Sequence, residues 1–470
     1  MFEFHRPDPI LIKFLGPQKP KAGAVYVRSP FTLLTRLGGK QYCYSTLTKQ
    51  GLELPPALDP DGRWTAEELT ADPDLAELLR GWFLKPADRD ETKLYTNIAS
   101  MMRAFHGGKG LASFVILPTM ACNARCSYCY EEGYRPVHMD RETCERTLAY
   151  ILQNRRPKTR LYLQWFGGEP LLGVDVIERI LEGLRAEGVE YRCGFTTNGS
   201  LIDEALADKM AGSWNTNSVQ ITVDGTEESY RRIKRYVNCP DAYRRVLRAI
   251  GLLSERGIQT LVRINLDGTN GGEVAGILRD LSESVRSKDK VRVYLSPIYQ
   301  RRMSKDCLAA WAEADALSPQ IEAAGFPTVS LVGLDTRFRI FRCMAANPAA
   351  NILITPEGRL SFCQHQLEGQ LYGSVREGIT DSDRVKALAT PPPVTEKCRD
   401  CPFLPDCTAF QNCPVYDLDC LAMRRGRTLP QLHCLIEKAL RKAAAEAPEH
   451  EPGEEPPENE PFDELLFHTE

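Results

Sequence analysis

The sequence Ala-Cys-Asn-Ala-Arg-Cys-Ser-Tyr-Cys-Tyr (121–130) places three cysteines, Cys122, Cys126 and Cys129, in one CxxxCxxC loop. Three thiolates this close together can ligate three irons of a [4Fe–4S] cube, which leaves the fourth iron without a protein ligand. An open coordination position is where a catalytic metal binds its substrate. The stretch predicts a catalytic iron–sulfur centre. The alternatives are a zinc knuckle, although zinc sites usually show paired CxxC or Cys/His sets, and three unrelated core thiols.

Composition narrows the class of protein. The chain has 470 residues and 16 cysteines, enough for two to four domains at roughly 150 residues each. Its formal charge of -4 gives no reason to expect a nucleic-acid or membrane-surface partner. We find no signal-peptide pattern in the N-terminal residues and no run of about 18 apolar residues. We therefore expect a cytoplasmic protein whose cysteines bind metal rather than form disulfides.

The middle of the chain alternates between short apolar runs and helical patterns. Strands are predicted at 113–117, 160–166, 190–197, 218–224, 260–267 and 290–296, with helices at 141–154, 174–187, 203–211, 241–256 and 271–284. Six such strands imply parallel βα units that wind into a full or partial barrel. Sites on these folds lie at the carboxyl ends of the strands.

Polar and glycine residues gather at those strand ends. They are Gly167, Gly168 and Glu169 after the second strand, Thr197 and Asn198 after the third, Thr222 and Asp224 on the fourth, and Arg263 and Asn265 on the fifth. Two glycines allow the backbone to approach a ligand closely. Thr222 and Asp224 face the same side of their strand, where burial is costly without a partner. A simple turn, a strand-end cap or an internal salt bridge would explain the same residues.

The regions on either side of the barrel differ in character. Residues 31–37 and 41–46 flank a Gly-Gly-Lys turn and predict a hairpin, and Thr65 or Asp61 caps a following helix. We expect a winged-helix-like unit over 1–95, or else an irregular extension packed on the core. Residues 446–470 are rich in Pro and Glu, which predicts a disordered acidic tail.

The cysteine loop, with aromatic Tyr128 before its last cysteine and Gly-Gly-Glu-Pro one strand later, resembles the radical S-adenosylmethionine (SAM) superfamily. The resemblance implies an α/β fold with a partial (β/α)6 barrel over 108–305. It also implies cleavage of S-adenosylmethionine, bound at the open iron, to a 5′-deoxyadenosyl radical. Carried over, the cofactor-binding residues are Tyr128, Gly167, Gly168, Glu169, Thr197, Asn198, Thr222, Asp224, Arg263 and Asn265.

A second cysteine system follows in the C-terminal part. It comprises Cys343, Gly358-x4-Cys363, Cys398-x2-Cys401-x5-Cys407, Cys413, Cys420 and Cys434. The pattern resembles the SPASM domain, here over 335–440, except that Gln411 replaces a cysteine and Cys413 comes two residues late. The resemblance implies two auxiliary [4Fe–4S] clusters, hence three in all. The outer cluster takes Cys398, Cys401, Cys407 and Cys434, and the inner one takes Cys343, Cys363 and Cys413, with Cys420 as its fourth ligand or a free thiol. A zinc ribbon is the alternative.

Five further cysteines are scattered. We expect Cys43, Cys144, Cys193, Cys239 and Cys307 to pack as small hydrophobic residues.

The resemblance also implies a function. SPASM enzymes mostly modify peptides or proteins, and the N-terminal unit fits a leader-recognition element that adds a strand to a sheet edge. We expect a maturase that installs a thioether or carbon–carbon crosslink in a ribosomally made precursor peptide, with an external electron donor such as flavodoxin or ferredoxin. One alternative is a sulfatase-maturing enzyme. The resemblance implies that such an enzyme has an Asp after the Gly-x4-Cys cysteine to act as general base, and Gln364 at that position argues against this role. The other is a non-catalytic zinc-binding scaffold.

Overall fold

The structure is a computed structural model of the chain. It describes residues 2–3, 9–16, 18–56, 58–59, 61–106, 110–131, 133–298, 312–328, 344–365, 371–390, 394–399, 401–407, 432–433, 436–437 and 440. The predicted ligands Cys343, Cys413, Cys420 and Cys434 lie outside the described residues, as do Cys307 and the predicted tail at 446–470.

Six parallel strands form the centre of the molecule. They are β8 (Ser113–Ile116), β9 (Leu161–Trp165), β10 (Tyr191–Thr197), β11 (Thr216–Thr222), β12 (Gln259–Leu266) and β13 (Val291–Pro297), and each pairs with its neighbour in sequence order. This confirms the predicted strands and the partial barrel, because within the described residues the sheet does not close on itself. The apolar runs form strands whose large apolar side chains are buried in the core, while several of the alternate positions are half-buried or exposed.

Helices cover the outside of this sheet. They are α5 (Arg141–Asn154), α6 (Val174–Ala186), α7 (Glu204–Ala211), α8 (Glu227–Lys234), α9 (Ala242–Glu255) and α10 (Val274–Ser284). Asp140 and Asp203 cap α5 and α7 by accepting backbone hydrogen bonds. Five of the six helices follow the prediction, whereas α8 was not predicted. Five of its eight residues are charged, and the apolar residues Tyr230 and Ile233 are too few to mark a helix in the sequence.

The C-terminal part extends the same sheet, which the sequence did not predict. Strand β14 (Asn351–Ile354) pairs in parallel with β8, and β15 (Arg359–Ser361), β16 (Gly373–Ser374) and β17 (Gly378–Ile379) continue antiparallel. The sheet therefore has ten strands among the described residues, and Cys363 comes two residues after the end of β15. Two further helices are α12 (Pro319–Ala323) and α13 (Ser382–Ala389).

The N-terminal unit is built from two small sheets and four helices. Strands β1 (Phe2–Glu3), β5 (Gln50–Leu54), β4 (Lys40–Ser45) and β3 (Thr32–Leu37) form one sheet in that order, and β6 (Trp64–Thr65), β2 (Val25–Arg28) and β7 (Leu84–Pro86) form the other. The helices are α1 (Pro9–Leu15), α2 (Ala66–Ala71), α3 (Pro73–Arg80) and α4 (Glu91–His106). The hairpin is confirmed, with Gly38 and Gly39 at positive φ, and so is the Thr65 cap, which forms a capping box with Glu68.

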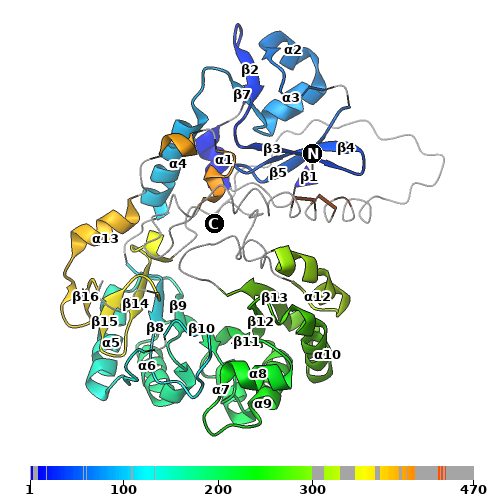
Figure 1. Cartoon of the computed structure of the whole chain (residues 1–470). Coiled ribbons are helices and arrows are strands. Elements are labelled where there is room, and N and C mark those ends of the chain that lie inside the picture. The colour runs from blue at the N-terminus through cyan, green and yellow to red at the C-terminus, as the bar shows by residue number, and fades with distance from the viewer. Residues whose placement is uncertain are drawn as a thin grey trace, which may run out of the picture.

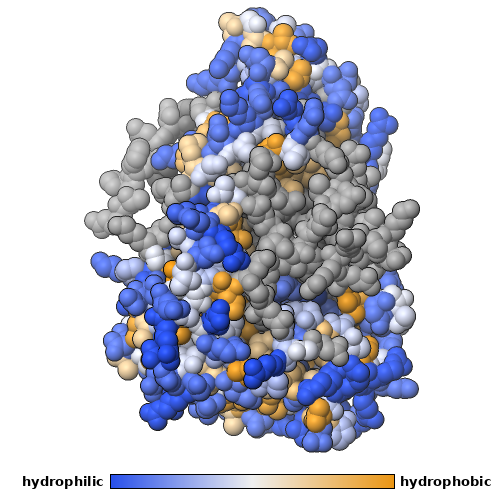
Figure 2. All heavy atoms as spheres, turned by 60° about the vertical axis from the view of Figure 1, so that its left-hand side comes forward, coloured by the Kyte–Doolittle hydropathy of each residue, from blue (hydrophilic) through white to orange (hydrophobic). Residues whose placement is uncertain are grey.

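Figure 1 shows the N-terminal unit above the barrel, with parts of the C-terminal region beside α1 and α4. The face in Figure 2 is mostly hydrophilic, with apolar residues in small groups. Within the described residues, none of the helices combines the length and apolar character needed to cross a membrane.

Candidate active site at the carboxyl end of the barrel

The cysteine loop is held from two sides. On one side the Gly-Gly-Glu backbone contacts it, since Gly168 N donates to Thr119 O at 3.2 Å and Glu169 N donates to Ala121 O at 2.9 Å. On the other side the end of α8 accepts from the loop, with Arg125 N to Lys234 O at 2.9 Å and Ser127 N to Ile233 O at 3.0 Å. The three cysteines are thus fixed between the end of β9 and the end of α8.

Cys122, Cys126 and Cys129 are free, partly buried thiols that lie close enough to influence one another's charge. Burial raises the pKa of Cys122 to about 11 and also raises the pKa of Cys126 and Cys129. Ala124 N donates to Cys122 Sγ at 3.4 Å. Desolvated thiols of this kind ionise when a metal supplies positive charge, so the residues fit an iron–sulfur cluster. No three His, Cys, Asp or Glu side chains in the described part of the chain are grouped to hold one metal ion.

Glu169 organises the second group of predicted residues. It is fully buried and accepts from Thr197 Oγ1 at 2.7 Å, from Asn198 N at 2.8 Å and from Leu171 N at 3.1 Å. Burial raises the pKa of Glu169, although these hydrogen bonds oppose the shift. Asn198 Nδ2 in turn donates to Asn123 Oδ1 at 2.7 Å, inside the cysteine loop. These contacts tie the Gly-Gly-Glu loop to the end of β10.

Tyr128, Asp224 and Lys234 form a buried network beside Cys126. Lys234 Nζ lies 2.8 Å from Asp224 Oδ2, and the two side chains are 4% and 1% exposed. The Tyr128 hydroxyl donates to Asp224 and accepts from Lys234. Burial alone would lower the pKa of Lys234, but Asp224 and Tyr128 outweigh it and raise that pKa well above its usual value. An ammonium charge is thereby fixed within reach of the Cys126 thiol.

Arg263 and Asn265 lie on the next strand and face the same side. Arg263 Nε donates to Asn265 Oδ1 at 2.7 Å, and Asn265 N donates to Asp224 Oδ1 at 3.0 Å. Thr222 is the direct neighbour of Arg263 in the β11–β12 register. Burial, with a smaller contribution from the Arg263 charge, lowers the pKa of His365. The predicted cofactor residues of the barrel are therefore brought to one end of the sheet.

The described cysteines of the second system lie in two places. Cys363 is buried at the barrel, and the ring of His365 two residues later is 4.5 Å from that of Tyr130, beside Cys129. Cys398, Cys401 and Cys407 are partly buried against the N-terminal unit instead. The scattered Cys43, Cys144 and Cys193 are buried as predicted. The prediction is wrong for Cys239, which is only partly buried beside Asp241 in the loop before α9.

Two residues of this site were not predicted from the sequence. Lys234 was missed because α8 was missed, and Asn123 because a polar residue inside a cysteine motif carries no distinctive pattern. The acidic first turn and basic last turn of Glu227–Lys234 could have indicated the helix. Nothing in the sequence indicates that its last residue is buried.

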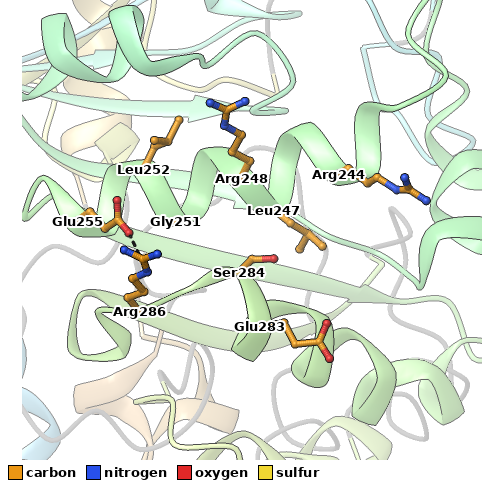
Figure 3. Close-up of a pocket in the computed structure, with 9 residues that line it drawn as sticks. All are labelled: Arg244, Leu247, Arg248, Gly251, Leu252, Glu255, Glu283, Ser284 and Arg286. Carbon is orange, nitrogen blue, oxygen red and sulfur yellow. Dashed lines mark ion pairs between the residues drawn. The ribbon is translucent and has the colours of Figure 1, made fainter.

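A pocket of about 410 Å³ lies away from this site, between α9 and α10 (Figure 3). Its rim carries Arg244, Arg248 and Arg286, which resembles an anion site. Each of the three, however, pairs with a carboxylate, Glu227 at 3.4 Å, Glu204 at 2.7 Å and Glu255 at 3.7 Å. The arginine charges are therefore compensated within the chain.

Gly168 can be tested by adding one methyl group. A Cβ at this position would lie 2.4 Å from Ala121 O and 2.5 Å from Met120 O, so Gly168→Ala must push the cysteine loop away. We expect a loss of about 1–3 kcal/mol in the free energy of unfolding, measured by urea denaturation. We also expect weaker S-adenosylmethionine binding in calorimetry. The control is Gly272→Ala, where a Cβ meets nothing within 4 Å. Equal free energies of unfolding for Gly168→Ala and Gly272→Ala would contradict the close contact at Gly168.

Comparisons with known proteins agree with this geometry. Residues 116–281 match the model of the radical SAM superfamily. The chain is 31% identical over 191 residues to a probable GTP 3′,8-cyclase of Methanopyrus kandleri, covering 40% of this chain and 57% of that protein. It is 24% identical over 167 residues to the radical SAM cyclopropyl synthase TigE of Paramaledivibacter caminithermalis, covering 32% and 34%. The chain thus spans about half, or less, of the length of these curated relatives.

Among solved structures, the chain is similar to SuiB of Streptococcus suis bound to its precursor peptide SuiA. The TM-score is 0.50 at 14% identity, covering 84% of this chain and 99% of that one. At this identity the likeness concerns the fold. The part of the chain that is similar to the radical SAM superfamily, residues 116–281, contains the cysteine loop and most of the partial parallel barrel.

Proposed function

We propose that the chain is a SPASM-type radical SAM enzyme that installs a thioether or carbon–carbon crosslink in a ribosomally made precursor peptide. The observation that carries the proposal is the position of Cys122, Cys126 and Cys129, clamped between the Gly-Gly-Glu loop and α8 at the carboxyl end of the sheet. The alternation of strands and helices directs every predicted cofactor residue of the barrel to this same end.

In this proposal the three cysteines hold a [4Fe–4S] cluster. The S-adenosylmethionine site is lined by the residues at the strand ends and in the cysteine loop, which are Tyr128, Gly167, Gly168, Thr197, Asn198, Thr222, Asp224, Arg263 and Asn265. The bound cofactors supply a 5′-deoxyadenosyl radical. The chain's own residues keep the loop in place and exclude water. Glu169 ties the Gly-Gly-Glu loop to the end of β10 through Thr197 and Asn198, and its backbone N–H donates to Ala121 O beside Cys122. The buried Tyr128–Asp224–Lys234 network orients Tyr128 next to the last cysteine.

A peptide substrate is favoured by the parts of the chain outside the barrel. In the N-terminal unit, β3 is at an edge of its sheet in the described residues, and an edge strand can pair with an extended leader peptide. SuiB, which shares the fold, is a protein bound to a precursor peptide. Two auxiliary clusters would be held by the C-terminal cysteines, one by Cys343, Cys363, Cys413 and Cys420 and the other by Cys398, Cys401, Cys407 and Cys434. A flavodoxin or ferredoxin would donate the electrons.

Two other reactions are open to a radical SAM domain. A sulfatase-maturing enzyme is disfavoured by Gln364, since an amide cannot take the proton that the oxidation releases. The second reaction is the conversion of GTP, because several relatives are GTP 3′,8-cyclases. The match to the Methanopyrus kandleri protein covers only 40% of this chain, so it gives little support to GTP as the substrate. The zinc-scaffold alternative predicts zinc without iron.

The test uses the full chain reconstituted without oxygen. The proposal predicts on the order of 12 irons per chain and absorbance near ~400 nm. With S-adenosylmethionine, dithionite and a short peptide encoded beside the gene, mass spectrometry should show a peptide that has lost a pair of hydrogens at a crosslink. Parallel reactions contain GTP or a sulfatase-derived peptide instead. Conversion of either of these, with the precursor unchanged, would contradict the proposal, as would zinc in place of iron.

A further inference from the structure

The loop that carries Cys398, Cys401 and Cys407 is built into the core of the N-terminal unit. Leu404, in the middle of this loop, belongs to the same buried apolar cluster as Leu11, Phe31, Leu47, Trp82, Tyr95, Ile98, Ala99 and Met102. The three cysteines pack against this cluster. In Figure 1 the segment lies beside α1 and α4, away from the barrel strands. The N-terminal unit therefore supplies the apolar wall of this cysteine group.

Polar contacts fix the same loop. Lys49 Nζ lies 2.6 Å from Asp406 Oδ1, and both side chains are 2% exposed. Thr46 donates its hydroxyl to Pro402 O, and Tyr95 OH donates to Pro405 O at 3.4 Å. A fully desolvated ion pair is costly to form and costly to break, because removal of one partner leaves a buried charge alone. The buried pair between Lys49 and Asp406 therefore fixes the position of the loop, which a solvent-exposed pair would not do.

The segment around Cys434 contacts the N-terminal unit as well. Leu432 and Ile436 form one buried cluster with Tyr42 and Tyr44 of β4. His433 contacts the hydroxyl of Thr35 on β3. Both described segments therefore contact the N-terminal unit, from which they are far apart in the sequence. The loop of Cys398, Cys401 and Cys407 packs on α1, α4 and the turn at 46–49. Leu432, His433 and Ile436, on either side of the predicted ligand Cys434, contact β3 and β4.

We propose that the N-terminal domain is an integral part of the outer auxiliary cluster site, and that Lys49 is the positioning residue of that site. The inference rests on the auxiliary clusters of the proposed function. It adds that this cluster assembles only while the N-terminal domain is folded against Cys398, Cys401 and Cys407. A leader peptide on this domain would then act directly on the surroundings of a redox centre rather than through a flexible tether.

The charge of the pair makes the inference testable in two directions. Lys49→Met removes the ammonium group 2.6 Å from the Asp406 carboxylate, next to Cys407, and this loss of positive charge opposes the addition of an electron to the cluster. Asp406→Asn removes the negative charge of the pair and favours that electron. The combined variant removes both charges. Lys40→Met is the control, because Lys40 belongs to the same domain but is 61% exposed in its pair with Glu53.

Each variant is reconstituted as the full chain, and iron, cluster potentials and metal-free stability are measured. We expect both single variants to lose up to about a third of the iron, on the scale of three cubes. In the fraction that retains the cluster, we expect its reduction potential to fall for Lys49→Met and to rise for Asp406→Asn. The iron content and reduction potential of the combined variant should return toward the wild-type values. Those of Lys40→Met should equal the wild-type values.

A readout without metal separates packing from redox effects. In metal-free protein, each single variant should lower the urea midpoint, and the combined variant should lower it by less than the two losses added. Additive losses, or full iron with unchanged potentials in both single variants, would overturn the inference. If wild-type protein holds only the radical SAM cluster, the auxiliary clusters of the proposed function fail, and the metal-free coupling still tests the contact itself.

Discussion

Cys126→Ala will reduce the formation of 5′-deoxyadenosine under dithionite to background. The middle cysteine of the loop is one of three proposed thiolate ligands, and its backbone O accepts from Cys129 N at 3.1 Å in the turn that closes the loop. Without its sulfur, a site-differentiated cube loses a ligand and the iron that holds S-adenosylmethionine is no longer presented. Chromatography of the reaction measures the product, and iron content should fall by about four per chain.

The matched control for this variant is Cys239→Ala. Cys239 is a free, partly buried thiol in a loop beside Asp241, outside every predicted ligand group. We expect its cleavage rate and iron content to equal those of the wild type. A Cys126→Ala protein that still cleaves the cofactor at the wild-type rate would refute the assignment of this loop. Loss in both variants would indicate general sensitivity to cysteine replacement instead.

Lys234→Met will have the largest effect on stability of any substitution in the barrel proposed here. The change leaves Asp224, 1% exposed, without the ammonium 2.8 Å away, and removal of one partner of a buried pair costs about 3–5 kcal/mol. Urea denaturation of the metal-free protein measures the loss. The second expected effect is a lower reduction potential of the cluster that we propose for Cys122, Cys126 and Cys129, because a positive charge near Cys126 is removed.

The control is Arg231→Met on the same helix, where the side chain is 66% exposed and the effect should stay within about 0.5 kcal/mol. The pH dependence gives a further check. Because the pKa of Lys234 is raised above its usual value, its contribution is complete below the ordinary lysine pKa and is lost only as pH rises through the raised one. The difference between Lys234→Met and wild type should therefore be constant between about pH 6 and about pH 9. Equal stability of Lys234→Met and Arg231→Met would contradict the buried pair.

The sequence predicts the barrel well for a physical reason. Strands such as Leu161–Trp165 bury large apolar side chains at alternate positions, and the short run rich in such residues is easy to recognise in the sequence. The polar residues at the strand ends were found for the complementary reason, since Thr222 and Asp224 interrupt an otherwise apolar pattern. Local composition decides both features, and local composition is what a single sequence displays.

The residues that escaped prediction depend on contacts far along the chain. In the sequence Lys234 resembles a surface lysine, because it stands in a charged stretch with Arg231 and Arg232. Its burial depends on contacts with Asp224 and Tyr128, which lie elsewhere in the sequence. Strand β14 becomes part of the sheet through pairing with β8, more than two hundred residues earlier. Lys49 likewise finds Asp406 at a separation of 357 residues. No periodicity within a segment encodes such partners.

The ion pair between Lys49 and Asp406 has a consequence for how the chain is made. Leu404 and Asp406 complete the interior of the N-terminal unit, yet Asp406 is synthesised 357 residues after Lys49. At ordinary translation speeds this delay is about 20 to 70 seconds. During that interval the nascent N-terminal unit lacks the apolar contact of Leu404 and the carboxylate of Asp406, so its interior is completed only after the strands of the barrel have been synthesised.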